Sequence, residues 1–330
     1  AASAAGMCSI ELRMNSPQSP SLDTPPQLVL PRPLGTLNFV AAWFVPWRPA
    51  FRTTAAQSKL KFYAHHRDAI GRHIAKYGSH EPLVTRWMAE FLSAAPRGLV
   101  VDIGANLGWH ALHAARHANV ETVVAFEPDP FNAWLLERNL AENGIDNVIV
   151  ESRAVGAAPG TAHLHRYGRN NFGRHSLAAD HGQGSRTVPV TDLDGALAAL
   201  GLREQPVSLI KIDVEGYEPK VIDGAMATLQ RTDGLILEYS PDLSAAGGLS
   251  TTAMMARLKD AGFSPFVLWS EGGTVPIEIG ELDGFAGSLD VIWVKAAQIA
   301  ALAHGMNVQD RGGASLLAIA EANKRIVKPI

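Results

Sequence analysis

Three segments of the sequence place charged residues and glycines at the ends of apolar runs. The first, Val100–Gly108, reads VVDIGANLG, with Asp102 ahead of Gly104, Asn106 and Gly108. An apolar strand that enters a glycine turn and then a helix puts the turn at the carboxyl end of the strand, where open α/β sheets bind ligands. The glycines would let the backbone approach a nucleotide-like group, and the helix N-terminus would offer free N–H donors.

This turn departs from two common phosphate-binding patterns. A dinucleotide fingerprint requires glycine where Asn106 stands, and a P-loop requires Gly-Lys followed by Ser or Thr, which is absent. An acidic residue ahead of the glycines suits a cofactor that carries an ammonium group and no phosphate, and S-adenosylmethionine is such a cofactor. The alternative is a tight strand–helix turn that binds nothing.

The second segment, FEPDP, contains Glu127 at the end of the next predicted strand. An acidic side chain about 20 residues beyond a glycine turn is placed to accept hydrogen bonds from ribose hydroxyls. Asp129 is better interpreted as the N-cap of a helix that has Pro130 at its first position.

The third segment, Leu209–Glu218, reads LIKIDVEGYE. Lys211, Asp213 and Glu215 alternate around the end of a predicted strand, so their side chains should point to the same side before the chain turns at Gly216. Charged groups at the end of a buried strand are costly unless they serve a site or pair with each other. A site beside the cofactor is the favoured reading, and a Lys211–carboxylate pair that only holds the turn is the alternative.

The elements that must position these segments alternate between short apolar runs and longer helical patterns. Continuous apolar runs such as LVVDI and LILEY suit strands buried on both faces of a parallel sheet. The predicted strands are 99–103, 122–126, 148–155, 207–213 and 235–239. The predicted helices are 81–95, 107–117, 130–143 and 219–230. Segments 263–268 and 291–295 are expected to form a closing pair of strands at the sheet edge.

Together these segments resemble the FkbM-type methyltransferases, a family that uses S-adenosylmethionine. The resemblance covers about residues 62–239 and includes RDAIGRHIAKYGSHEP, VVDIGANLGWHALHAA, VVAFEPDP, AVG, VTDLDGAL and LIKIDVEGYEPKVIDGA. It implies a doubly wound, mostly parallel seven-stranded α/β sheet of the class I methyltransferase (Rossmann-like) type, with the last strand antiparallel. It also implies methylation, mostly of hydroxyl groups.

The resemblance, together with the position of His110 in the first helical turn beside the glycine turn, assigns two groups of residues on this chain. The expected cofactor-binding residues are Asp102, Gly104, Asn106, Gly108, Glu127 and Ala154. The expected catalytic residues are Asp213, Glu215, His110 and Glu81. Methyl transfer to a hydroxyl needs a positioned base, and Asp213 is the leading choice among these four. No decisive set of metal ligands is visible, so no metal is predicted.

These assignments favour an O-methyltransferase that acts on a small hydroxylated molecule or a sugar. A protein that binds the cofactor without turnover, as a partner or regulator, is the alternative. A nucleic-acid amino-methyltransferase is disfavoured because DVEGYE stands where an Asn/Asp-Pro-Pro-aromatic turn is expected. The formal net charge of −3 also lacks the basic excess of a general nucleic-acid binder.

The composition limits location and domain organisation. One cysteine, Cys8, excludes an internal disulfide and fits a reducing compartment, so we expect a cytoplasmic protein. No signal peptide and no apolar stretch of the ~20 residues that a spanning helix needs is recognised. The expected parts are a flexible Pro-rich leader (1–36), an aromatic strap (37–61), a methyltransferase domain (62–297) with an inserted hairpin and loop (161–190), and a C-terminal extension (298–330) with a loosely attached helix (315–327).

Overall fold

The computed structural model describes residues 37, 50–65, 68–168, 171–269, 273–296, 298–299 and 314–327. The expected leader (1–36) lies outside the described residues, as do residues 38–49 of the aromatic strap and residues 300–313 and 328–330 of the C-terminal extension. Among the described helices, none is long and apolar enough to cross a membrane.

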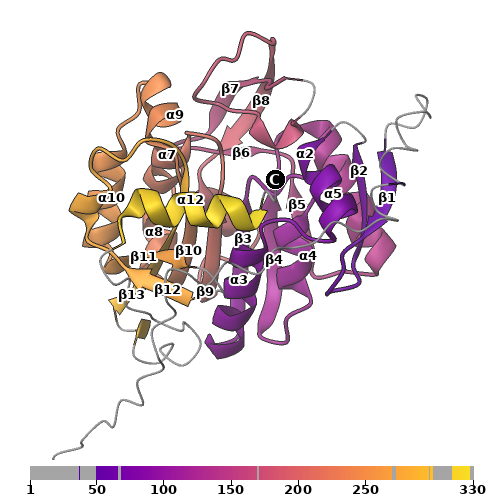
Figure 1. The fold of residues 1–330 in the computed structure, drawn as a ribbon, viewed down its shortest axis with the longest axis horizontal. Coiled ribbons are helices and arrows are strands. Elements are labelled where there is room, and N and C mark those ends of the chain that lie inside the picture. Colours follow the sequence, from indigo (N-terminus) through magenta and orange to yellow (C-terminus); the bar gives the residue numbers. More distant parts are fainter. Residues whose placement is uncertain are drawn as a thin grey trace, which may run out of the picture.

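A sheet of eight strands forms the centre of the fold (Figure 1). Five neighbouring strands run parallel, β13 is antiparallel to both of its neighbours, and β12 is antiparallel to β11 at the edge. In spatial order the strands are β12 (Gly273–Pro276), β11 (Phe263–Trp269), β13 (Leu289–Lys295), β10 (Thr232–Tyr239), β9 (Val207–Ile212), β3 (Gly98–Ile103), β4 (Val120–Phe126) and β5 (Val148–Glu151).

This order confirms the class I methyltransferase arrangement, with an eighth strand added at one edge. The chain builds outward from β3 through β4 to β5, then returns to place β9 on the other side of β3. The strand order therefore reverses between β3 and β9, and ligands of open α/β sheets bind at such a switch point. These two strands carry the glycine turn and the DVEG segment.

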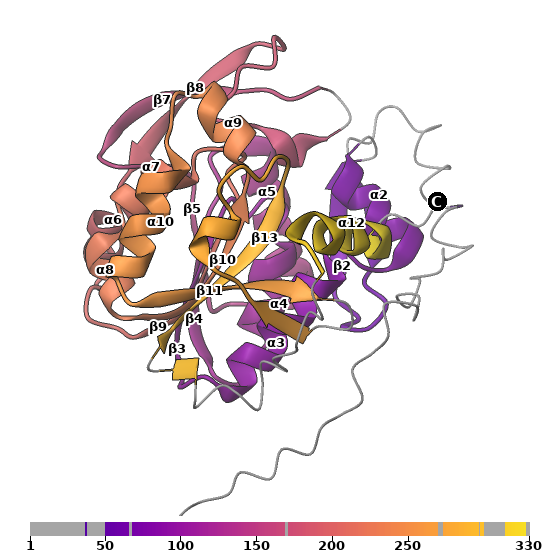
Figure 2. The same cartoon turned by 60° about the vertical axis from the view of Figure 1, so that its left-hand side comes forward.

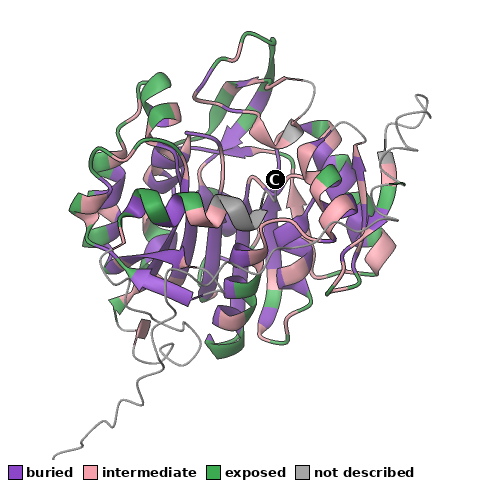
Figure 3. Cartoon of the chain, in the orientation of Figure 1, coloured by how far each residue is buried: buried purple, intermediate pink, exposed green. Residues whose placement is uncertain are grey.

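Helices cover both faces of the sheet (Figure 2). Alternate strand residues supply two separate cores, since Val100 and Leu209 belong to one and Val101 and Ile210 to the other. The first face carries α3 (Pro82–Ala94), α4 (Trp109–Ala115) and α5 (Pro130–Asn143). The second carries α6 (Leu193–Ala199), α7 (Glu218–Asp223), α8 (Met226–Gln230) and α10 (Thr251–Asp260). Most of the sheet is buried as a result (Figure 3).

Smaller elements surround this body. A hairpin of β1 and β2 precedes α2, and a three-stranded sheet contains β6, β7 and β8. Their bounds, with those of the remaining elements, are β1 (Ala50–Thr54), β2 (Lys61–His65), α2 (Ala69–Tyr77), β6 (Ala154–Val155), β7 (Gly160–His165), η1 (Phe172–Arg174), β8 (Ser185–Thr191), α9 (Pro241–Ala246), η3 (Ile279–Glu281) and α12 (Leu316–Val327).

Several predicted boundaries match, and the departures have local causes. The helix predicted at 219–230 is two helices that are separated at Gly224, where a Cβ would lie 2.0 Å from the Gly156 carbonyl oxygen. The strand predicted at 148–155 divides into β5 and β6, which join different sheets. The predicted hairpin within 161–190 is confirmed as the antiparallel pair of β7 and β8.

The C-terminal elements correct two expectations. The segments 263–268 and 291–295 do pair, but β13 is inserted between β10 and β11 and the edge strand is β12. The helix expected to be loosely attached, α12, packs against β11 and buries Leu316, Ile319 and Ala320 (Figures 1 and 2). The hairpin of β1 and β2 was not predicted, although Phe51 packs against the main core from there.

Candidate active site

Two adjoining cavities lie at the carboxyl ends of β3, β4 and β9. The larger has a volume of about 460 Å³ and the smaller about 50 Å³. Four residues line both of them, namely Gly104, Asn106, Gly173 and Asp213. Asp213 is the one with an ionisable side chain, so an acidic residue lies where the two cavities meet.

The glycine turn after β3 is shaped by packing as well as by access to a ligand. Gly104 has a φ of 84°, and a Cβ on it would lie 1.9 Å from the backbone oxygen of Asp213, so β3 and β9 can approach only around a glycine. Gly108 caps α4 in the left-handed conformation, and a Cβ there would meet the Leu136 side chain at 2.3 Å. Gly104 lines both cavities, whereas Gly108 lines neither, so Gly108 supports the turn from behind.

Glu127 lies in the smaller cavity and organises the turn. Its Oε2 accepts a hydrogen bond from the Asn106 N–H at 2.8 Å, and its Oε1 accepts one from the Asp129 N–H at 2.8 Å. Burial raises the pKa of Glu127 to about 8. The Asn132 amide also interacts with the carboxyl group. Because a carboxylate has about four acceptor positions, room remains for a donor such as a ribose hydroxyl.

The rest of the smaller cavity is mostly apolar, as an aromatic base requires. Ala154 lines it, as expected, together with Ile103, Phe126, Val155, Leu164 and Leu177. Arg153 also reaches it, but its guanidinium is bound to Glu151 at 2.7 Å. The residues therefore fit a nucleoside.

Asp129 is confirmed as the N-cap of α5, since its side chain accepts from the Phe131 and Asn132 amides at 2.9 and 3.1 Å. We expect Asp129→Ala to cost about 1 kcal/mol of stability, which is typical of a lost N-cap, and to lower the melting temperature by a few degrees. Affinity for a nucleoside ligand should change little. Asp129→Asn, which can still cap, is the matched control, and a similar loss in both variants would contradict the capping role.

Asp102 lies behind the cavities and lines neither. The residue is 2% exposed, and neither carboxylate oxygen has a hydrogen-bond partner of normal geometry among the described residues, although the Ala111 N–H still lowers its pKa slightly. Burial raises the pKa of Asp102 to about 6, and the ammonium of Lys211 opposes this shift. Direct contact between Asp102 and the cofactor, expected from the sequence, therefore stays a prediction.

Lys211 is a buried cation that links three acidic side chains. Its Nζ donates to Oδ2 of Asp213 at 3.0 Å, which is the ion pair considered as the alternative for this segment. Burial lowers the pKa of Lys211, but Asp213, Glu81 and Asp102 together raise it further, to well above its usual value. Lys211 is therefore always charged, and it fixes one oxygen of Asp213 while the other is free of this bond.

Glu81 and His110 form a second pair in the wall of the larger cavity. Glu81 precedes α3 with a φ of 42°, and its Oε2 lies 2.7 Å from Nε2 of His110. Burial lowers the pKa of His110 to about 4, so the ring is neutral at pH 7. A carboxylate can only accept, so Nε2 carries the proton and donates to Glu81. Nδ1 is then an acceptor, and it is buried without a partner among the described residues.

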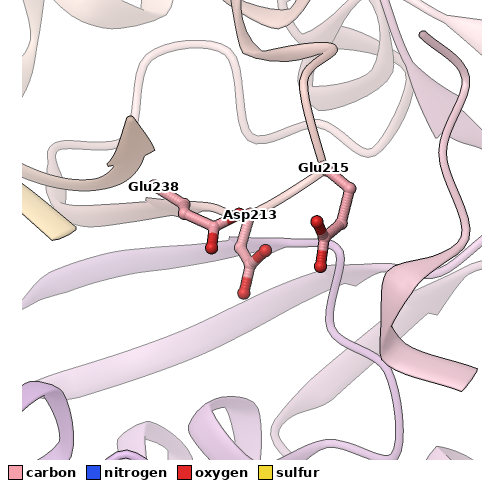
Figure 4. A group of neighbouring side chains, drawn as sticks. All are labelled: Asp213, Glu215 and Glu238. Atoms are coloured by element: carbon pink, nitrogen blue, oxygen red, sulfur yellow. The ribbon is translucent and has the colours of Figure 1, made fainter. Parts of the chain in front are cut away.

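Three carboxylates lie close together at the carboxyl ends of β9 and β10. Asp213, Glu215 and Glu238 each offer one oxygen, and these atoms lie within 4.8 Å of one another (Figure 4). Oxygen ligands of this kind suit a hard divalent cation. In the structure, however, Lys211 binds Asp213, and Nε of Arg174 lies 3.3 Å from both oxygens of Glu215. Protein cations thus already balance two of the three charges.

Burial also raises the pKa of carboxyl groups in this wall. The pKa of Glu215 is about 7, with Asp213 adding to the effect of burial. Burial raises the pKa of Glu238 well above its usual value and that of Asp290 to about 7. These groups are close enough to repel one another when ionised.

The structure brings together the four residues expected to be catalytic, since Asp213, Glu215, His110 and Glu81 all line the larger cavity. Sequence reasoning missed Arg174, Glu238, Asp290 and Asn323, which line it too. Glu238 had a signal, because it is a charged residue near the end of the apolar run LILEY, much as Asp213 ends LIKID. The others come from segments in which nothing marks them.

Comparisons with known proteins indicate the family of this chain. Residues 102–265 match the model of the methyltransferase FkbM domain. The hexuronic acid methyltransferase AglP of Haloferax volcanii is 29% identical over 137 residues, which are 42% of this chain and 54% of that protein. The chain thus matches about half the length of this curated relative.

Two solved structures are also similar to this chain. An rRNA methylase from Streptococcus thermophilus has 13% identity and a TM-score of 0.38, with 63% of this chain and 93% of that chain covered. TYW2 of M. jannaschii, in complex with AdoMet, has 13% identity and a TM-score of 0.36, with 74% and 84% covered. Both TM-scores are below 0.5, so the fold assignment stands on the strand order above.

Proposed function

Residues 102–265 form a methyltransferase FkbM domain, and from this premise we propose that the protein is an O-methyltransferase that acts on a hydroxyl group of a small molecule or sugar. S-adenosylmethionine is the cofactor, and when bound it supplies a methyl group on a positively charged sulfur. The observation that carries the proposal is the position of Asp213, the one ionisable side chain that lines both cavities.

We assign the nucleoside end of the cofactor to the smaller cavity. Glu127 offers acceptor positions for the ribose there, and the surrounding side chains are apolar. The larger cavity, about 460 Å³, is then left for the remainder of the cofactor and for the acceptor. Gly104 and Asn106 lie in the wall of both, so the turn after β3 lies along the path between them.

The chemistry requires two things of the protein. It must hold the acceptor oxygen near attack distance, about 3–3.5 Å from the methyl carbon, and it must remove the hydroxyl proton. Asp213 suits the second task because Lys211 fixes its Oδ2 at 3.0 Å and thereby orients Oδ1. His110, held by Glu81, is the second candidate for the base, since Nδ1 of the neutral ring has a free lone pair.

Nucleic acid is not part of the proposed acceptor class. Glu81, Asp213, Glu215, Glu238 and Asp290 all line the larger cavity. The described cations in the same wall, Lys211 and Arg174, are bound to carboxylates. A phosphate backbone needs unpaired positive charge, which this wall does not offer.

Binding of S-adenosylhomocysteine is the first test. We expect it to raise the melting temperature by several degrees at 100 times its Kd, because a ligand specific for the native state at that concentration contributes about 2.7 kcal/mol. NAD at the same concentration should give no shift, since the turn lacks the dinucleotide pattern. Thermal unfolding measured by differential scanning fluorimetry, with and without each ligand, decides this.

Turnover separates the enzyme from the alternative of a silent cofactor-binding protein. Both bind S-adenosylhomocysteine, but only an enzyme transfers labelled methyl groups from S-adenosylmethionine to a hydroxylated acceptor. Stabilisation by NAD in place of S-adenosylhomocysteine would reject the cofactor, whereas binding without transfer to any acceptor would favour the silent protein.

A further inference from the structure

The outer wall of the larger cavity comes from the last part of the chain. Leu268 on β11, Ser288 and Asp290 at the start of β13, and Asn323 on α12 all line it. These residues follow position 265, where the match to the family model ends. The wall is fixed in place, because Ile319 and Ala320 of α12 are buried. Any ligand that this wall recognises is thus recognised by residues that lie outside the region matching the family model.

Buried hydrogen-bond acceptors without donors characterise this wall. Nδ2 of Asn323 donates to the Leu268 carbonyl at 2.8 Å, and because a carbonyl only accepts, this bond fixes the orientation of the amide. Oδ1 of Asn323 is then buried without a partner among the described residues. Glu238 has a similar unpartnered oxygen, since its Oε1 accepts from Ser288 at 2.6 Å while its Oε2 is buried without a partner among the described residues. This oxygen accepts a hydrogen bond when the group is ionised and donates one when it is protonated.

Unpaired buried acceptors are costly, and a ligand that brings donors relieves the cost. A ligand that only accepts hydrogen bonds cannot pair with these acceptors, so the free-energy cost remains. Hydroxyl and ammonium groups are the donors that small molecules commonly carry. The wall therefore favours an acceptor molecule with several hydroxyl or amino groups beyond the one that is methylated.

The carboxyl groups of the wall disfavour anions. Glu215, Glu238 and Asp290 line the cavity together with Asp213, and burial raises the pKa of each, with repulsion from neighbouring carboxylates adding to the shift. Arg174 is bound to Glu215. An anionic ligand would add a like charge to this group, whereas a neutral or cationic ligand would not.

We infer that the acceptor is a neutral or cationic polyhydroxylated molecule, such as a neutral or amino sugar, and that Asn323 helps to select it. This inference rests on the proposed function. It separates this chain from the similar Haloferax volcanii protein, whose name gives a hexuronic acid as its substrate.

The test compares glycosides that differ in one charge. Methyl glucoside, methyl glucosaminide and methyl glucuronide, and the same three in the galactose series, are offered to the protein with labelled S-adenosylmethionine. Transfer is measured as kcat/KM, and binding to the protein saturated with S-adenosylhomocysteine is measured calorimetrically. We expect the uronides to be at least about 10-fold poorer than the neutral or amino glycosides of the same series, because a like charge in a partly desolvated site is unfavourable.

Asn323→Leu tests the specificity residue, because leucine has a similar size and no acceptor atom. For the best glycoside we expect KM to rise roughly 3- to 10-fold, the usual effect of one neutral hydrogen bond, with kcat and the Kd for S-adenosylhomocysteine unchanged. Glu321→Gln, on an exposed position of the same helix, is the control and should change neither constant. An unchanged Kd also shows that the variant is folded.

Each outcome bears on one claim. Failure to bind S-adenosylhomocysteine rejects the proposed function itself. Binding of S-adenosylhomocysteine together with a preference for uronides, or with neither binding nor transfer for any glycoside, overturns the inference and leaves cofactor binding standing. A loss in Asn323→Leu that is confined to kcat would remove Asn323 from acceptor recognition.

Discussion

Replacing Asp213 by Asn should lower kcat by about 10²- to 10⁴-fold, the usual effect of losing a positioned general base. The Kd for S-adenosylhomocysteine should stay within about threefold, because Glu127 and the turn after β3 are untouched by the change. Asparagine keeps the shape of the side chain and removes the charge that accepts a proton. Single-turnover transfer of labelled methyl groups and calorimetric titration on the same preparation measure both quantities.

The position of Asp213 explains why we expect so large an effect. It follows β9 at the switch point, and its backbone oxygen packs against Gly104 while its carboxylate lines both cavities. Lys211 stays charged and so cannot itself accept a proton. The ion pair with Lys211 orients the Asp213 carboxylate. The same contact is therefore required whether Asp213 acts as the base or only stabilises the turn.

A purely structural Asp213 makes a different prediction. Without its charge, Lys211 is left buried and poorly balanced on either reading, so the melting temperature should fall in both cases. On the structural reading alone, the affinity for S-adenosylhomocysteine should fall together with the rate. Asp260→Asn, on an exposed position at the end of α10, is the matched control for the substitution itself. If wild type is stimulated by Mg²⁺ and Asp213→Asn is not, the carboxylate acts as a cation ligand with Glu215 and Glu238.

The pH profile distinguishes the remaining bases if Asp213→Asn retains full activity. A base acts in its deprotonated form, so kcat/KM rises with pH up to its pKa and is flat above it. Glu215 as the base gives a rise through about pH 7, where its pKa lies. His110 as the base gives a flat profile above about pH 5, because its pKa is about 4.

Local signals in the sequence were enough to predict much of the fold. Helix α5 was predicted with the same ends that the structure shows, since Asp129, Pro130 and Gly144 mark its start and stop chemically. The strands β3, β4, β9 and β10 followed from continuous apolar runs, and the Lys211–Asp213 contact followed from alternation along one strand. Such features depend on neighbouring residues only.

Features that depend on packing between distant segments could not be predicted in this way. Glu81 and His110 are 29 residues apart and meet because α3 and α4 pack on the same face of the sheet. The position of β13 between β10 and β11 depends on the path of the chain after β12, and the pattern of apolar residues in the sequence does not specify this path. Asn323 reaches the cavity only because α12 packs against β11.

Replacing Glu127 by Ala should weaken binding of S-adenosylhomocysteine roughly 10- to 100-fold, as expected for the loss of a charge-assisted hydrogen bond to the ribose. The loss has two parts. The ribose hydroxyl loses its acceptor, and the Asn106 and Asp129 amides lose the carboxylate that holds the turn. Calorimetric titration measures the Kd, and the melting temperature of the free variant reports the cost to the turn.

The pH dependence of binding identifies Glu127 more directly than the size of the loss. Burial raises its pKa to about 8, and only the ionised form accepts hydrogen bonds on both oxygens, so affinity should rise as pH increases from 6 to 8, approaching tenfold per pH unit. Glu127→Gln cannot ionise and should bind weakly with no such dependence. A wild-type affinity that is constant over this range would show that the cofactor does not use the Glu127 carboxylate, and the acceptor of the ribose would then have to be sought elsewhere in the smaller cavity.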